Sequence, residues 1–106
     1  MSSSRTVEEI QRLIASAFVV VFSKSWCPFC DRVKQLFRSL GVSFKVIELD
    51  QEKNGSAIQS ALYELTKQRT VPNVFINGQH VGGCDQVMQL ERKGTLKKLL
   101  EPVLTA

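Results

Sequence analysis

The chain of 106 residues has no long apolar run, no low-complexity tract and no internal repeat. Its longest apolar run, AFVVVF at residues 17–22, is far shorter than the roughly 18 residues of a membrane-spanning helix, so no membrane partner is expected. The first residues, MSSSRTVEEIQRL, lack the apolar core of a signal peptide, which predicts an unexported, cytoplasmic chain. A longer isoform with a targeting extension would instead reach the nucleus or the mitochondria.

Cysteine is scarce as well. Cys27, Cys30 and Cys84 are an odd number and are too few for a secreted disulfide framework. In a reducing compartment, a Cys-x-x-Cys pair is more often catalytic or metal-binding than structural. The pair within SKSWCPFC, at residues 23–30, is therefore the first candidate for chemistry.

A strong charge of one sign is also missing. The formal charge is +4 and the isoelectric point is about 9.2, but lysine and arginine are scattered, and only ERKG and LKKLL are clustered. This distribution indicates a solvated surface that attracts anions mildly, and it argues against a nucleic-acid partner.

The length fits one domain covering residues 1–106, with a single core. Thr6 with Glu9 and Ser56 with Gln59 have the spacing of capping boxes, which predicts that helices begin there. The predicted elements are a helix at 6–16, a strand at 17–22, a helix ending at Gly41, a strand at 43–49, a helix at 56–67, strands at 73–76 and 79–81, and short helices at 85–92 and 95–100.

This order predicts an α/β fold. A strand, helix and strand in succession favour a parallel pair with a right-handed crossover. The Asn77-Gly78 dipeptide predicts a hairpin, which adds antiparallel strands. We therefore expect a small mixed four-stranded sheet with helices on both faces.

Cys27 follows the first strand and opens the next helix, where Pro28 suits the first turn because its missing N–H costs nothing there. The unpaired backbone N–H groups and the helix dipole stabilise a thiolate at this position, and Lys24 adds positive charge. Cys30 lies nearly one turn further on, where its sulfur can reach Cys27 but is expected to be more buried. Cys27 would attack a disulfide, and Cys30 or an external thiol would resolve the product.

Two other interpretations stay open at this point. Both cysteines could simply be small buried apolar residues. Alternatively, Cys27, Cys30, His80 and Cys84 could form a zinc site. Structural zinc usually holds short loops together, however, whereas this chain already has an α/β core. His80 also fits an exposed strand position.

Three motifs together resemble the dithiol glutaredoxins over about residues 6–100: KSWCPFC, RTVPNVFINGQHVGG and GGCD. Trp26 is also found before the first cysteine in thioredoxins, but those carry Gly-Pro between their cysteines. The resemblance is greatest to the second vertebrate type, or to the glutaredoxin domain fused to some thioredoxin reductases. It implies a thioredoxin fold with Pro72 in the cis form.

The resemblance also implies a glutathione site. The Val71 backbone would pair with the cysteinyl part of glutathione, and the amides of Cys84 and Asp85 would bind its γ-glutamyl carboxylate. Gly82 and Gly83 would let the ligand approach closely. Asp85 would pair the amine or act as a helix N-cap. The full set of implied glutathione-binding residues is Lys24, Phe29, Gln59, Arg69, Thr70, Val71, Pro72, Gly83, Cys84 and Asp85.

Within this set, Lys24 and Gln59 match family positions that hold the glycine carboxylate, and Arg69 is a weaker candidate. Phe29 replaces a common tyrosine and supplies a wall without a hydroxyl. Cys84 would be a packing residue or a third redox thiol.

The implied function is that of a monomeric enzyme, a glutathione-disulfide oxidoreductase. It would reduce protein–glutathione mixed disulfides and protein disulfides through a Cys27 thiolate. Its partners would be glutathione, glutathionylated proteins and disulfide-bonded proteins. A second interpretation is a homodimer that carries a [2Fe–2S] cluster on Cys27 of each chain and two glutathiones, although Pro28 argues against it. A third is a regulatory domain of a larger reductase; the start of the chain and its last helix favour a free-standing protein.

Overall fold

The computed structural model describes residues 3–104. A four-stranded mixed sheet forms the middle layer, with strands β1 (Val19–Ser23), β2 (Lys45–Glu48), β3 (Asn73–Ile76) and β4 (Gln79–Gly82) in the order β2-β1-β3-β4. β1 pairs in parallel with β2 and antiparallel with β3, and β3 and β4 form an antiparallel hairpin. This is the mixed sheet that the sequence predicted.

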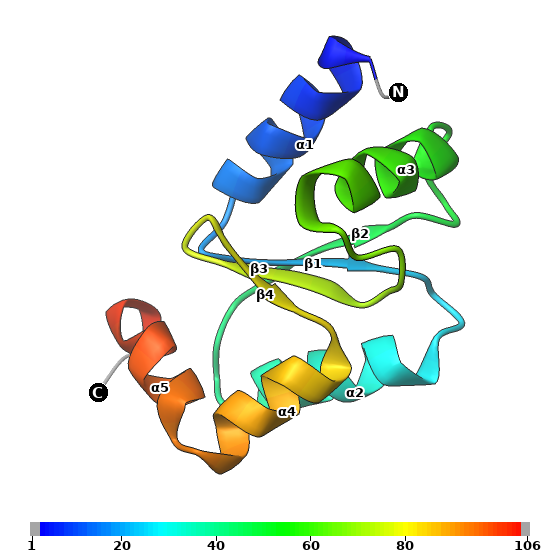
Figure 1. The fold of residues 1–106 in the computed structure, drawn as a ribbon. Coiled ribbons are helices and arrows are strands. Elements are labelled where there is room, and N and C mark those ends of the chain that lie inside the picture. Colours follow the sequence, from blue (N-terminus) through cyan, green and yellow to red (C-terminus); the bar gives the residue numbers. More distant parts are fainter. Residues whose placement is uncertain (1–2, 105–106) are drawn as a thin grey trace.

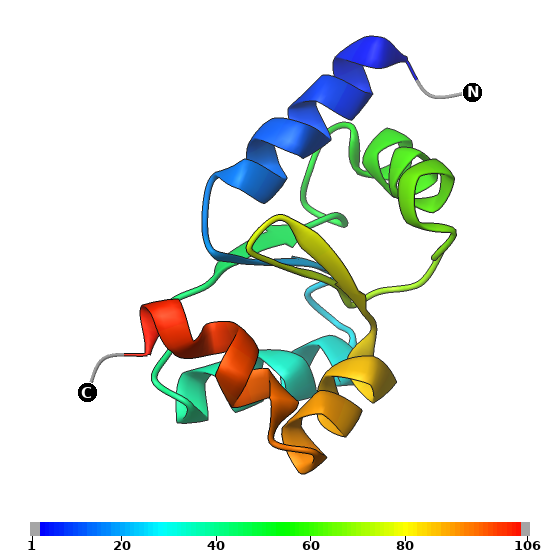
Figure 2. The same cartoon turned by 60° about the vertical axis from the view of Figure 1, so that its left-hand side comes forward.

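Helices cover both faces of the sheet (Figures 1 and 2). Helices α1 (Ser4–Ala15) and α3 (Gly55–Thr66) lie on one face. Helices α2 (Pro28–Ser39), α4 (Cys84–Arg92) and α5 (Thr95–Leu100) lie on the other, and a 3₁₀ turn at Glu101–Val103 follows them. None of the helices in the described part of the chain is long and apolar enough to cross a membrane.

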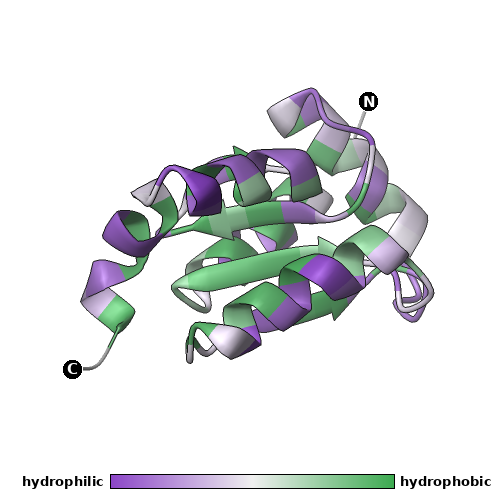
Figure 3. Ribbon diagram, turned by 90° about the horizontal axis from the view of Figure 1, so that it is seen from below, coloured by the Kyte–Doolittle hydropathy of each residue, from purple (hydrophilic) through white to green (hydrophobic). Residues whose placement is uncertain are grey.

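The strand β1 is buried on both faces, so its residues divide between two cores. Val19 and Val21 pack with α2, α4 and α5, whereas Val20 and Phe22 pack with α1 and α3. Figure 3 shows the strands as mainly hydrophobic and the helices as alternating between hydrophobic and hydrophilic residues. Burial on two sides explains why this strand reads as a continuous apolar run instead of an alternating one.

The hairpin forms where predicted, because Asn77 and Gly78 both have positive φ angles, 52° and 77°, as a two-residue turn of this type requires. The two predicted capping boxes were wrong. Helix α1 begins earlier, because the Ser3 hydroxyl accepts the Thr6 N–H at 3.1 Å.

Helix α3 begins at Gly55. The Gln59 side chain does not cap this helix, because it donates to the Arg69 carbonyl. Asn54 occupies the N-cap position, but its side-chain amide donates to Glu9 at 2.8 Å. Long-range contacts therefore decide where this helix starts. Most other predicted ends are displaced by one or two residues, and the ends of β3 and α5 are as predicted.

Candidate active site

Cys27 occupies the N-cap of α2, at the end of the turn that follows β1. Its N–H donates to the Lys24 carbonyl at 3.1 Å, and Pro28 takes the first helical position. The Cys27 sulfur accepts the N–H of Cys30 at 3.3 Å, so the thiol acts as the helix cap. A thiolate in this place is stabilised by the helix N-terminus, and this supports its predicted role as nucleophile.

Cys30 is more deeply buried than Cys27: its exposed fraction is zero, against 6% for Cys27. Burial and the neighbouring Cys27 sulfur raise the pKa of the Cys30 thiol from 9.0 to about 11. Cys30 is therefore a neutral thiol at physiological pH. No disulfide joins the two residues in this structure, which therefore represents the dithiol state.

A pocket of about 410 Å³ opens beside these cysteines. The peptide bond between Val71 and Pro72 is cis, as expected, and the Val71 carbonyl lies 3.9 Å from the Cys27 sulfur. The pocket gathers predicted binding residues from three parts of the chain: Phe29, Thr70, Val71, Pro72, Gly83, Cys84 and Asp85.

Two glutamines that the sequence analysis did not single out also line this pocket. The Gln68 side-chain amide donates to the carbonyls of Thr70 and Pro72, at 3.0 and 2.9 Å. The Gln86 side-chain oxygen accepts the Gly83 N–H at 2.9 Å. Gln86 stands three residues after the helix N-cap, a spacing that could have revealed it. Gln68 has no such local signal.

Helix α4 begins on the far wall of the pocket, with Gly83 as N-cap and Cys84 and Asp85 in its first two positions. Asp85 is exposed, and the alternative role of N-cap is excluded because Gly83 takes that place. Cys84 is only 7% exposed, and burial raises the pKa of its thiol, although the nearby Arg32 partly offsets this. Of the three thiols, Cys27 is the one whose sulfur accepts a backbone N–H at a helix N-terminus.

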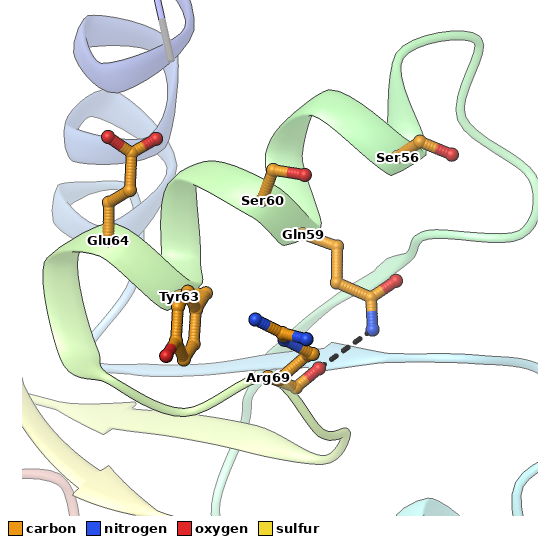
Figure 4. A pocket seen from close by; sticks show the side chains of 6 residues that line it. All are labelled: Ser56, Gln59, Ser60, Tyr63, Glu64 and Arg69. Carbon is orange, nitrogen blue, oxygen red and sulfur yellow. Dashed lines mark hydrogen bonds between the residues drawn. The ribbon is translucent and has the colours of Figure 1, made fainter. Parts of the chain in front are cut away.

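The remaining predicted residues lie outside this pocket. Lys24 and Gln59 border a cleft of about 270 Å³, together with Trp26 and Asp50. Gln59 and Arg69 border a larger groove of about 730 Å³ along α3, shown in Figure 4.

Two contacts link the residues of that groove. The Gln59 amide donates to the Arg69 carbonyl at 2.9 Å, so these two predicted residues are neighbours. The Arg69 guanidinium stacks on the Tyr63 ring, 4.3 Å from its centroid.

The zinc alternative finds no support in the geometry. Across residues 3–104, no three His, Cys, Asp or Glu side chains are placed to hold a metal ion. His80 is exposed on β4, where its Nε2 lies 2.8 Å from the Asn73 side-chain oxygen. A [2Fe–2S] cluster would take only the Cys27 sulfur from each chain, and that interpretation stays a prediction.

Residues 19–81 match the family model described as Glutaredoxin, which is more than half of the chain. The chain belongs to the glutaredoxin family. Glutaredoxins are thiol oxidoreductases, and a dithiol pair at the N-terminus of α2 agrees with that chemistry.

The relatives extend the match beyond that segment. Glutaredoxin-C6 from Oryza sativa is 64% identical over 87 residues, covering 82% of this chain and 78% of the relative. A glutaredoxin from Vernicia fordii is 58% identical over 90 residues, covering 85% and 86%. These are plant proteins, so the finer resemblance to the second vertebrate type is not supported.

Among solved structures, a buckwheat glutaredoxin–glutathione complex superimposes with a TM-score of 0.93 and 50% identity, covering 97% of this chain and 94% of that chain. The expected thioredoxin fold of a glutaredoxin is thus confirmed.

Proposed function

We propose that this glutaredoxin reduces mixed disulfides between glutathione and protein thiols. The observation that carries the proposal is the position of Cys27 as the cap of α2, beside a pocket whose walls expose the Val71 backbone and the first N–H groups of α4. The buckwheat relative, solved as a glutathione complex, supports glutathione as the ligand of this pocket.

The proposed binding mode uses the ends of the tripeptide. The γ-glutamyl carboxylate would meet the N–H groups of Cys84 and Asp85, and the Asp85 carboxylate would pair the amine. The cysteinyl part would pair with the Val71 backbone, which places its sulfur next to Cys27. The glycine carboxylate would reach the neighbouring cleft, where Lys24 and Gln59 lie.

The reaction then follows from the thiols. The Cys27 thiolate attacks the glutathione sulfur of the mixed disulfide, a Cys27–glutathione disulfide forms, and the protein thiolate leaves and takes a proton. A second glutathione thiolate attacks the glutathione sulfur of that intermediate. This releases glutathione disulfide and restores the Cys27 thiolate.

Cys30 is not needed in this cycle. With an intramolecular protein disulfide as substrate, Cys27 would form a mixed disulfide with the protein. Cys30 would then lose its proton and displace the protein thiol, leaving a Cys27–Cys30 disulfide that glutathione reduces.

The test is the glutathione-dependent reduction of a glutathionylated peptide by wild type, Cys27→Ser and Cys30→Ser. We expect Cys27→Ser to be inactive and Cys30→Ser to retain most of the activity. If Cys30→Ser is also inactive, a dithiol cycle replaces the proposed one. If the wild type is inactive, the proposed function is wrong.

A further inference from the structure

The turn that presents Cys27 is held by Asp50, which lies just after the end of the neighbouring strand β2. β1 and β2 end together: Ser23 is in register with Glu48, and the Leu49 N–H donates to the Ser23 carbonyl at 2.8 Å. After this point, β1 continues into the turn that ends at Cys27, and β2 continues into Asp50. The strand pairing therefore brings Asp50 to the side of the turn.

Both oxygens of the Asp50 carboxylate bind Ser25. Oδ1 accepts the Ser25 N–H at 3.0 Å, and Oδ2 accepts a short hydrogen bond from the Ser25 hydroxyl. Ser25 lies within the turn that is closed by the hydrogen bond from the Cys27 N–H to the Lys24 carbonyl. The carboxylate thus fixes the segment two residues before the nucleophile.

The charge state of Asp50 suits this role. The two hydrogen bonds from Ser25, with a smaller contribution from Lys24, lower the pKa of the Asp50 carboxyl. It is therefore a carboxylate at neutral pH. It also borders the cleft that contains Lys24, which the proposed function assigns to the glycine end of glutathione.

We propose that Asp50 is a positioning residue, which clamps the turn at Ser25 and thereby sets the place of the Cys27 sulfur at the helix N-terminus. The inference deepens the proposed function and rests on it for the role of Cys27. It does not make Asp50 a catalytic residue, because Asp50 touches the turn and not the sulfur. A small displacement of a nucleophile costs a large factor in rate.

The test compares Asp50→Asn, Ser25→Ala and the variant that carries both substitutions. The control is Glu8→Gln, which also removes one negative charge, at an exposed position on α1. Two rates are measured: kcat/KM with the glutathionylated peptide, and alkylation of Cys27 by iodoacetamide, followed on the Cys27 peptide by mass spectrometry. Alkylation needs no glutathione site, so it reports on the Cys27 thiolate alone.

We expect Asp50→Asn to lower both rates by about fivefold to tenfold, as for loss of a charge-assisted hydrogen bond. Ser25→Ala, which keeps the backbone bond, should lower them less, and the double variant should match Asp50→Asn alone. Glu8→Gln should remain close to wild type.

Two results would overturn the proposal. One is an unchanged alkylation rate in both Asp50→Asn and Ser25→Ala. The other is a higher KM in Asp50→Asn with unchanged alkylation, because Asp50 would then act only through the charge of Lys24. If Asp50→Asn does not fold, as judged by circular dichroism, Ser25→Ala decides alone. A wild type that cannot reduce the peptide would refute the proposed function, while the alkylation comparison would still test the clamp.

Discussion

The backbone N–H of Cys30 points at the sulfur of Cys27, with an N···S distance of 3.3 Å. This N–H belongs to the first turn of α2, whose N-terminus favours negative charge at the sulfur that caps it. Cys30, in contrast, is fully buried, and burial together with the Cys27 sulfur raises the pKa of its thiol to about 11.

Selective alkylation follows from this difference. At pH 8, only about one Cys30 in a thousand is a thiolate, and burial also raises the pKa of the Cys84 thiol, which disfavours its thiolate. Iodoacetamide should therefore label Cys27 first, with little reaction at the other two thiols until the chain is unfolded in urea. Peptide mass spectrometry of a time course measures this. Equal labelling of Cys27 and Cys30 in the folded protein would contradict it.

Alkaline pH should destabilise the protein through Cys30. The thiol ionises near pH 9.0 in the unfolded chain and near pH 11 in the folded one. Its contribution to stability is thus present below pH 9 and is lost as the pH rises toward 11, because ionisation then favours the unfolded chain. Urea unfolding at pH 8 and pH 10.5 should show a smaller loss of unfolding free energy in Cys30→Ser than in wild type. The same loss in both proteins would assign the effect to other groups.

Local signals in the sequence were sufficient for the order of elements and for the place of Cys27 at the start of a helix. The hairpin at Asn77-Gly78 and the helix opening at Pro28 depend on neighbouring residues only. The contacts of Asp50 and Gln68 could not be read in this way, because Asp50 binds a residue 25 positions earlier and Gln68 binds carbonyls of an irregular segment. A sequence pattern indicates periodicity, but it does not indicate which polar side chains the fold brings into contact.

Gln68 should support glutathione binding without touching the reacting sulfur. Its amide holds the carbonyls of Thr70 and Pro72, on either side of Val71, which lines the pocket and whose carbonyl lies 3.9 Å from the Cys27 sulfur. Gln68→Ala removes two hydrogen bonds, each worth about 1 kcal/mol. We expect KM for the glutathionylated peptide to rise about fivefold with kcat nearly unchanged. Gln89→Ala, at an exposed position on α4, is the control and should match wild type. An equal loss in kcat would show that Gln68 acts on the chemistry.

Removal of one partner from the ion pair between Lys34 and Glu48 should destabilise the protein strongly. The Lys34 ammonium on α2 is nearly inaccessible and lies 2.7 Å from the Glu48 carboxylate at the end of β2. Glu48→Gln leaves this buried charge with only the exposed Asp31 carboxylate, 3.9 Å away, and should lower the free energy of unfolding by about 3 kcal/mol.

The reverse change, Lys34→Met, should also destabilise the protein, because Glu48 Oε1 is already buried without a hydrogen-bond partner among residues 3–104 and Oε2 would lose Lys34. The double variant, which removes both charges, should recover most of the loss seen in Glu48→Gln. Asp31→Asn is the control: Asp31 is 55% exposed and lies 3.9 Å from Lys34. Urea unfolding of the four variants measures these free energies. If Glu48→Gln leaves the free energy of unfolding unchanged, water already solvates the Lys34 ammonium.

Gly55 should tolerate no side chain. A Cβ atom at this position would lie 1.9 Å from the Leu49 carbonyl oxygen, and a backbone atom cannot rotate out of the way as a side chain can. Gly55→Ala should therefore displace the start of α3 from the end of β2. We expect a loss of about 3 kcal/mol, although alanine usually stabilises a helix.

Gly41→Ala separates this clash from backbone strain. Gly41 has a φ of +74°, and among the described residues no atom beyond its chain neighbours would lie within 4 Å of the added Cβ. Gly41→Ala should therefore lower the free energy of unfolding by only about 1 kcal/mol, the cost of a left-handed backbone for alanine. The two variants also differ in what they disturb, because Leu49 precedes Asp50. Gly55→Ala should therefore slow alkylation of Cys27 even under conditions where it is fully folded, whereas Gly41→Ala should leave that rate unchanged. If Gly55→Ala folds and its Cys27 is alkylated at the wild-type rate, the contact between Asp50 and Ser25 tolerates movement of the segment that follows β2.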